Sequence, residues 1–313
     1  MKTNPPTKAN TGSMKSLSEI QKTIRVSNKK FKLSDYSTRI SKNSIGKSIE
    51  EASLANDIAE IATLQNKLYA EDRQSLLIIL QGMDGSGKDG TIKHVMRGIN
   101  PQGVLVTSYK HPTNQELEHD YLWRHTIKLP EHGQIVIFNR SHYENVLISR
   151  VHPELVLAER LHGYDKLSKI DKAFWEQRYD QINHFEKRNI ETGTQILKFF
   201  LHISKDEQCK RFLERINNED KHWKFSSSDI EERKYWAEYQ DAYQQAIKHT
   251  STKIAPWYIV PADDKFLAHV LIGKIILDKL RDMKPTFPPK TKQEQEYLLE
   301  AKAILEKELN VEN

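Results

Sequence analysis

Leu76-Leu-Ile-Ile-Leu80, followed after Gln81 by Gly82-Met-Asp-Gly-Ser-Gly-Lys-Asp-Gly90, decides the fold. The apolar run predicts a strand buried on both faces, and the glycine-rich part fits G-x-x-x-x-G-K, the pattern of a phosphate-binding loop that opens a helix. Glycine permits positive φ angles, so successive backbone N–H groups can surround phosphate oxygens at the positive end of that helix. Lys88 is expected to reach the transferred phosphates, and a glycine-rich turn without a ligand is the alternative. The expected phosphate-binding residues are Gly82, Gly85, Ser86, Gly87 and Gly90.

Two carboxylates distinguish this loop from most phosphate-binding loops. Asp89 stands where Ser or Thr usually holds Mg²⁺, and Asp84 lies inside the loop. A carboxylate about 4 Å from a phosphate charge is repelled by roughly 4 kcal/mol at an effective dielectric constant near 20, so both carboxylates need compensation. We therefore expect Asp84 and Asp89 to hold Mg²⁺, or Mn²⁺ in its place, directly or through water. Alternatively, one of them deprotonates or orients the attacking phosphate.

The strand predicted over 134–138 ends in Asn139 and Arg140. A Walker B motif would place Asp at position 139, and Asn139 is a neutral metal ligand at best, which agrees with a metal held by the loop carboxylates. Arg140 follows the carboxyl end of a central strand, where α/β proteins bind ligands, and its guanidinium can hold a phosphate through two parallel hydrogen bonds. A surface ion pair is the alternative role for Arg140.

Strand and helix patterns alternate along most of the chain, which predicts an α/β fold with a doubly wound, mainly parallel sheet of the P-loop kinase type. Short apolar runs predict five strands, at 76–80, 103–108, 134–138, 195–203 and 257–260. Helices are expected at 48–69, 88–99, 114–128, 171–191, 205–217, 229–249, 264–282 and 291–309, so that helical N- and C-terminal extensions flank the sheet. We divide the chain into a polar, basic and partly disordered arm at 1–45, a kinase core at 46–285 and a helical extension at 286–313.

The charge, the cysteine content and the apolar runs of the sequence bear on its partners and its cellular compartment. The 313 residues carry a formal net charge of +5, and the pI near 8.9 is compatible with a polyanionic partner. Cys209 is the only cysteine, which excludes an intramolecular disulfide and favours the cytoplasm. The sequence contains no long apolar run and no signal-peptide pattern, so it predicts neither a membrane span nor secretion.

Four motifs together make the sequence resemble the polyphosphate kinase type 2 family, P-loop enzymes that phosphorylate nucleotides with polyphosphate. They are the loop at 82–90, His119-Asp-Tyr-Leu-Trp-Arg124, Phe138-Asn-Arg-Ser-His-Tyr-Glu144 and Lys221-His-Trp-Lys-Phe225. The resemblance covers most of residues 75–275 and implies a mobile lid at about 205–228. It also implies that Asp84, Lys88, Asp89 and Arg140 are catalytic. The Asn-Arg-Ser-His-Tyr-Glu form is similar to that of the subgroup that phosphorylates AMP as well as ADP.

The expected lid carries two arginines. Arg211 and Arg215 lie four residues apart on a predicted helix and so share one face. That face can close over a phosphate chain and neutralise charge in the transition state, which makes both arginines catalytic candidates. A solvated helix face, with Glu207 and Glu214 as partners, is the alternative.

Two further candidates follow the second predicted strand. Lys110 stands near the loop and is a candidate phosphate or nucleotide contact, with a solvated loop lysine as the alternative. By resemblance, the helix that carries Arg124 forms part of the acceptor side.

The expected enzyme is a polyphosphate:AMP/ADP phosphotransferase whose reaction can run in either direction. Its expected partners are inorganic polyphosphate and the adenine nucleotides AMP, ADP and ATP, with guanine nucleotides as further candidates and no membrane or nucleic acid. A homo-oligomer is the expected assembly. An ATP-dependent nucleotide or nucleoside kinase is the first alternative, because the loop and an arginine-rich lid suit it equally well. A basic polyanion-binding protein with a vestigial loop is the second.

Overall fold

A sheet of five parallel strands forms the centre of the protein. The structure, a computed structural model, describes residues 16–27, 30–40 and 51–311. The strands lie in the order β2-β3-β1-β4-β5, and every neighbouring pair is parallel. The five predicted strands are confirmed, each to within one residue at either end. They are β1 (Ser75–Gln81), β2 (Val104–Ser108), β3 (Ile135–Asn139), β4 (Thr194–His202) and β5 (Trp257–Pro261).

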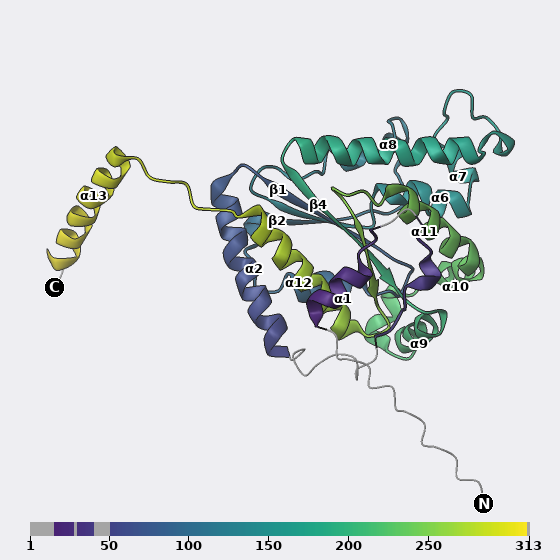
Figure 1. The fold of residues 1–313 in the computed structure, drawn as a ribbon, viewed down its shortest axis with the longest axis horizontal. Helices are drawn as coiled ribbons and strands as arrows, with labels where there is room; N and C mark the ends of the chain where they lie inside the picture. The colour runs from purple at the N-terminus through teal and green to yellow at the C-terminus, as the bar shows by residue number, and fades with distance from the viewer. Residues whose placement is uncertain (1–15, 28–29, 41–50, 312–313) are drawn as a thin grey trace, which may run out of the picture.

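Helices cover both faces of the sheet (Figure 1). On one face, α12 (Lys265–Met283) packs against α2 (Glu51–Glu71) and α3 (Lys88–Val95). On the other face, α8 (Lys172–Glu191) packs against β4 and α11 (Trp236–Thr250). The three interior strands are buried almost throughout because helices cover them on both sides. The predicted doubly wound α/β fold is confirmed.

The strand order places the carboxyl end of β1 near the middle of the sheet. β1 pairs with β3 on one side, where Leu76 lies opposite Ile135, and with β4 on the other, where Leu76 lies opposite Gln195. After β1, the chain first forms β2 and β3 on one side of β1 and then β4 and β5 on the other side. The direction in which strands are added to the sheet therefore reverses at β1. Open α/β sheets bind ligands in the crevice at such a switch point. The loop at 82–90 therefore lies where this fold favours a ligand.

The N-terminal part of the chain is more ordered than the sequence predicted. Helix α1 (Leu17–Ile24) begins at a capping box in which Ser16 and Glu19 bond reciprocally. Two buried isoleucines of α1 join the core, and Val26 then donates its N–H to the carbonyl of Trp257 in β5 at 2.9 Å. The sequence predicted a partly disordered arm over 1–45, and residues 16–27 and 30–40 of it are ordered here; the S-x-x-E signal at 16–19 could have predicted α1. The rest of that arm lies outside the described residues.

Three predicted helices differ from those observed. The segment 114–128 forms two short helices, α4 (Asn114–Leu117) and α5 (Trp123–Thr126), because the Asp120 carboxylate accepts the Leu122 N–H at 2.9 Å and turns the chain between them. The segment 229–249 is divided into α10 (Ser227–Glu232), a 3₁₀ turn at Arg233–Tyr235 and α11. Helix α3 ends at Val95, before Gly98 with a φ of 77°. The sequence did not predict the short helical turns between β3 and α8, which are His142–Val146, α6 (Ile148–Val151), α7 (Glu154–Leu157) and Leu167–Lys169.

The two segments expected outside the sheet are both helical. The expected lid consists of α9 (Lys205–Ile216) and a 3₁₀ segment, η6 (Glu219–Lys224). Helix α13 (Lys292–Val311) stands away from the sheet and its flanking helices at the C-terminal end of the described chain (Figure 1). Among the described residues, no helix combines the length and the apolar character that crossing a bilayer requires.

Candidate active site

The loop between β1 and α3 has the backbone of a phosphate-binding loop. Gly85 and Gly87 adopt φ angles of 79° and 102°, and Gly82 adopts 157°, so the predicted positive φ angles are confirmed. A Cβ at Gly85 would lie 3.1 Å from the ring of Phe212, which leaves little room for any other residue there. In the part of the chain that the structure describes, the backbone N–H groups of Gly85, Gly87 and Lys88 donate to no protein acceptor. The loop therefore offers free donors to an anion.

Lys88 bends back over its own loop. Its ammonium donates to the carbonyls of Gly82 at 2.6 Å and Met83 at 3.3 Å, and the residue is 8% exposed. Burial lowers the pKa of Lys88, while the nearby Asp84 carboxylate acts in the opposite direction. The ammonium thus lies beside the free N–H groups, as expected for a lysine that binds phosphate.

Asp84 and Arg140 form an ion pair across the loop. The guanidinium Nη2 of Arg140 lies 2.6 Å from Asp84 Oδ1, and both side chains remain more than one-third exposed. Burial alone would raise the pKa of Asp84, but the charges of Lys88, Arg140 and Arg215 lower it, so this carboxylate is ionised. Arg140 reaches the loop from a left-handed backbone with a φ of 63°, a conformation that costs a non-glycine residue about 1–3 kcal/mol. Such strain is typical of functional sites.

Asp89 lies at the opening of the loop, beside the end of β3. Its side chain is 69% exposed, its Oδ1 accepts the amide N–H of Asn139 at 2.8 Å, and its Oδ2 lies 3.9 Å from the ammonium of Lys224. Asn139 Oδ1 is buried and has no hydrogen-bond partner among the described residues. The Asn139 amide nitrogen therefore holds the exposed Asp89 carboxylate, while the amide oxygen of the same side chain is buried.

The two arginines of the expected lid do not share one role. Arg211 was expected to face a phosphate chain, but it lies behind the loop and is 5% exposed. Its five N–H donors all have acceptors: Glu207 at 3.0 Å, the loop carbonyls of Gly85 and Ser86 at 3.0 Å each, and the carbonyls of Ala262 and Asp263 at 2.6 and 3.2 Å. A guanidinium with no free donor contacts no phosphate in this conformation.

Arg215 does face the site. Its guanidinium lies 3.7 Å from Asp229 of α10, and its charge contributes to the lowered pKa of Asp84. Arg215 lies one helical turn after Arg211 on α9. Because α9 packs closely against the loop, Arg211 is enclosed, whereas Arg215 remains at the rim of the site. Helical spacing alone did not reveal this difference.

Comparisons with known proteins agree with this geometry. Residues 44–288 match the family model described as Polyphosphate kinase 2 (PPK2). This chain belongs to the polyphosphate kinase 2 family. The predicted resemblance and the enzyme class expected from it are confirmed.

Three relatives of this polyphosphate kinase illustrate the match. An ADP-polyphosphate phosphotransferase of Rhodopseudomonas palustris is 44% identical over 252 residues, which cover 80% of this chain and 86% of the relative. An AMP/ADP-polyphosphate phosphotransferase of Meiothermus ruber is 43% identical over 233 residues, covering 74% and 82%. The crystal structure of polyphosphate kinase 2 from Arthrobacter aurescens TC1 superposes with a TM-score of 0.80 at 39% identity, covering 92% of this chain and 98% of that one.

The other two predicted site residues of this kinase, Lys110 and Arg124, follow β2 in the sequence. Lys110 is exposed and its carbonyl accepts Nη2 of Arg124 at 2.9 Å. Arg124 is 9% exposed, pairs with Glu116 at 3.1 Å and stacks on the ring of Tyr109 at 5.0 Å. Arg124 thus holds the segment that carries Lys110, and in the described residues neither side chain bonds to the loop. Their roles in substrate binding remain predictions.

Two residues of the polyphosphate kinase site were missed by sequence reasoning. The Gln208 side-chain amide donates to the carbonyl of Asp84 at 2.8 Å. It precedes Arg211 by three residues and Arg215 by seven, so helical spacing could have placed it on the same face. Glu144 lies near Lys88 and Arg140; burial raises its pKa, and these two cations oppose that shift. It ends the motif at 138–144, which was a signal for it.

Proposed function

We propose that this enzyme transfers the terminal phosphoryl group of inorganic polyphosphate to AMP and ADP with the help of Mg²⁺ at Asp89 and Asp84. The observation that carries the proposal is the loop itself, with free N–H donors beside Lys88 and the Asp84–Arg140 pair. AMP is included as an acceptor because the strand end reads Asn139-Arg140 and because the Meiothermus ruber relative is named for AMP as well as ADP.

The chemistry exchanges one phosphoanhydride for another. An oxygen of the nucleotide's terminal phosphate attacks the end phosphorus of polyphosphate, a P–O bond forms, and the P–O bond to the next phosphate breaks and releases the shortened chain. The Lys88, Arg140 and Arg215 cations neutralise the charge that spreads over the transferred group. Since the bond formed resembles the bond broken, the reaction is reversible, and polyphosphate length and the nucleotide ratio set its direction.

The loop carboxylates fit a divalent metal ion. Mg²⁺ takes one or two carboxylates and completes its shell with water and substrate phosphates, so the two carboxylates here suffice. The Asn139 amide, which donates to Asp89 Oδ1 at 2.8 Å, would hold this carboxylate in place for the metal ion. Asp89 is the principal ligand in this proposal, because Asp84 is already paired with Arg140. A bound Mg²⁺ would neutralise phosphate charge and orient the reacting oxygens.

The change Asp89→Asn tests this assignment. We expect the Mg²⁺ concentration at half-maximal activity to rise by about 10–100-fold, because an amide replaces the charged ligand. Asp206→Asn is the matched control, since Asp206 is an exposed carboxylate in the first turn of α9. The measurement is initial rate against Mg²⁺ concentration for both variants and the wild type. An unchanged half-maximal concentration in Asp89→Asn would remove Asp89 from the metal site, and the same titration of Asp84→Asn would show whether Asp84 holds the metal.

Product formation from polyphosphate without ATP decides between the candidate functions. The purified protein is supplied with AMP, ADP, GMP or GDP, polyphosphate and Mg²⁺, and the nucleotides are separated by ion-exchange chromatography. We expect ADP and ATP from the adenine nucleotides, and we keep guanine nucleotides as further acceptors. Products that form only when ATP replaces polyphosphate would identify an ATP-dependent kinase instead. Polyphosphate binding without turnover would identify a polyanion-binding protein.

Two further expectations complete the proposal. We place the reaction in the cytoplasm, where the exposed free thiol of Cys209 would stay reduced. We also expect a homo-oligomer, and the exposed apolar side chains of Tyr297, Leu299 and Leu305 on α13 support it. Sedimentation velocity over a range of protein concentrations measures the assembly.

A further inference from the structure

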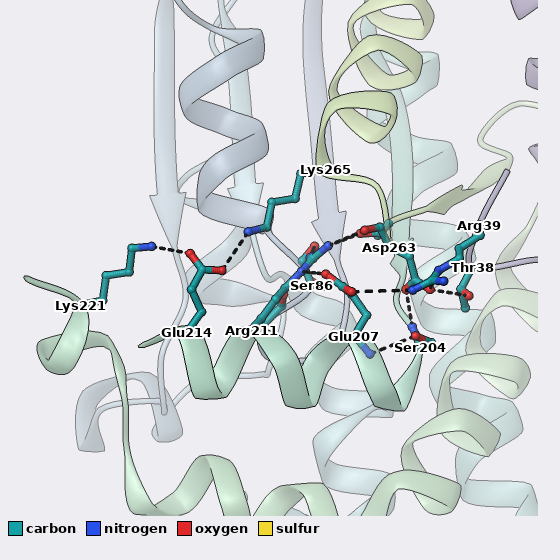
Figure 2. Close-up of polar contacts among 12 residues, drawn as sticks. Thr38, Arg39, Ser86, Ser204, Glu207, Arg211, Glu214, Lys221, Asp263 and Lys265 are labelled. Carbon is teal, nitrogen blue, oxygen red and sulfur yellow. Dashed lines mark hydrogen bonds and ion pairs between the residues drawn. The ribbon is translucent and has the colours of Figure 1, made fainter. Parts of the chain in front are cut away.

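The carboxylate of Asp263 joins two parts of the chain that are distant in sequence (Figure 2). Its Oδ1 accepts the backbone N–H of Ser204, the residue that caps α9, at 2.8 Å. Its Oδ2 accepts the Thr38 hydroxyl at 3.0 Å and Nε of Arg39 at 2.9 Å, and the Asp263 N–H donates to the carbonyl of Thr38 at 3.1 Å. The Asp263 side chain is 3% exposed, so these donors replace water around a buried charge. The N-terminal segment 31–40 is thus fixed to the start of the lid helix.

Arg211 continues this network to the phosphate loop. Its Nη2 donates to the carbonyls of Ala262 and Asp263, and its Nη1 to those of Gly85 and Ser86. Figure 2 shows Arg211 next to Ser86, with Asp263 close by. Arg211 therefore connects the segment after β5 with the back of the loop.

A hydrogen bond to a loop carbonyl also orients a loop N–H. The carbonyl of one residue and the N–H of the next belong to one planar trans peptide and point in opposite directions. When Arg211 holds the Ser86 carbonyl, it turns the Gly87 N–H away from itself, and that N–H is one of the free donors of the loop. Arg211 thus fixes the direction of a donor without touching the ligand.

We infer that Thr38, Arg39 and Asp263 are positioning residues for phosphoryl transfer, which act through Arg211 on the peptides of the phosphate loop. Thr38 and Arg39 lie outside the residues that the family model matches, which begin at 44. Arg39 reaches the network from the surface, with 61% of its side chain exposed and its Nη2 also 3.9 Å from Glu207, the partner of Arg211. The inference rests on the proposed function, because turnover of polyphosphate is its main readout.

The change Arg39→Ala tests the inference and leaves the buried Asp263 carboxylate its bonds from the Ser204 N–H and the Thr38 hydroxyl, so we expect the variant to fold. We expect kcat to fall about tenfold, with KM nearly unchanged, because the loop donor loses its fixed orientation. Arg281→Ala is the matched control, since Arg281 is 45% exposed and pairs with Glu60 at 2.6 Å between α12 and α2. Arg39→Ala should lower Tm more than Arg281→Ala, because it removes a donor from a buried carboxylate, and only Arg39→Ala should lower kcat.

Two further measurements separate positioning from general support. Amide hydrogen exchange of residues 82–90 should be faster in Arg39→Ala and unchanged in Arg281→Ala. In an Arg211→Lys background, Arg39→Ala should have no further effect on kcat or on loop exchange, because the route to the loop is already broken. Equal kcat and equal loop exchange in the two alanine variants would overturn the inference, as would a full Arg39→Ala effect in the Arg211→Lys background. A wild type without polyphosphate turnover would contradict the proposed function instead, and loop exchange would still test the positioning.

Discussion

The change Lys88→Ala is expected to lower kcat by about 10²–10³-fold, the loss that follows when one preorganised donor to a transition-state charge is removed. Lys88 is held over the loop by the carbonyls of Gly82 and Met83, next to the free N–H groups of Gly87 and of its own backbone. Its ammonium is therefore in place before a phosphate arrives, and no other lysine bonds to this loop's backbone in the described residues. The measurement is steady-state kinetics with polyphosphate and ADP.

The matched control is Lys93→Ala, one and a half turns further along α3. Lys93 is exposed and carries the same charge, so its removal changes the net charge of the helix without reaching the loop. Similar turnover in Lys88→Ala and the wild type would show that the loop does not carry the chemistry. Lys88→Arg distinguishes charge from shape, because a planar guanidinium is too large for the enclosed position and should not restore the rate.

The fold was predictable from the sequence because its signals are local. Strands β1 and β3 are continuous apolar runs, and β4 is an apolar run interrupted by Lys198. The glycine pattern at 82–90 identifies the first crossover directly. The errors lie where one residue overrides a longer pattern, as where Asp120 caps Leu122 and divides the predicted helix at 114–128. Helix α1 was missed although its capping box was readable, because a polar composition outweighed the short apolar stripe.

The candidate site was predictable in its chemistry but not in its contacts. The sequence placed Asp84, Lys88 and Arg140 together, since the carboxyl ends of neighbouring parallel strands meet at one edge. The sequence could not show that Arg211 lies behind the loop. Helical spacing shows which residues share one face of a helix, but not which part of the protein that face packs against. The bond between Arg39 and Asp263 joins residues 224 positions apart, and no spacing rule reaches so far.

A buried ionic network lies beneath the strand end that carries Arg140. The ammonium of Lys198 in β4 donates to Glu186 at 2.6 Å, to the Thr250 carbonyl at 2.7 Å and to the Tyr143 hydroxyl at 3.0 Å. Tyr143 in turn donates to Glu186 at 2.7 Å, and Lys198 is 0% exposed. The segment after β3 thus points Arg140 toward the loop and Tyr143 into the core. Lys198 anchors Tyr143 and thereby holds the backbone segment that carries Arg140.

The change Lys198→Ala is expected to lower the free energy of unfolding by about 3–5 kcal/mol, because it leaves the charge of Glu186 buried without its partner. Urea denaturation measures this loss, and Lys187→Ala is the control: Lys187 lies on α8, is 61% exposed and pairs with Glu191 at 3.7 Å, so its removal should cost about 0.5 kcal/mol or less. The double change Lys198→Met with Glu186→Leu should recover part of the stability, since an apolar pair leaves no uncompensated charge. Equal losses in Lys198→Ala and Lys187→Ala would mean that water or a rearranged Tyr143 compensates Glu186. The network would then not be what holds the Arg140 segment in place.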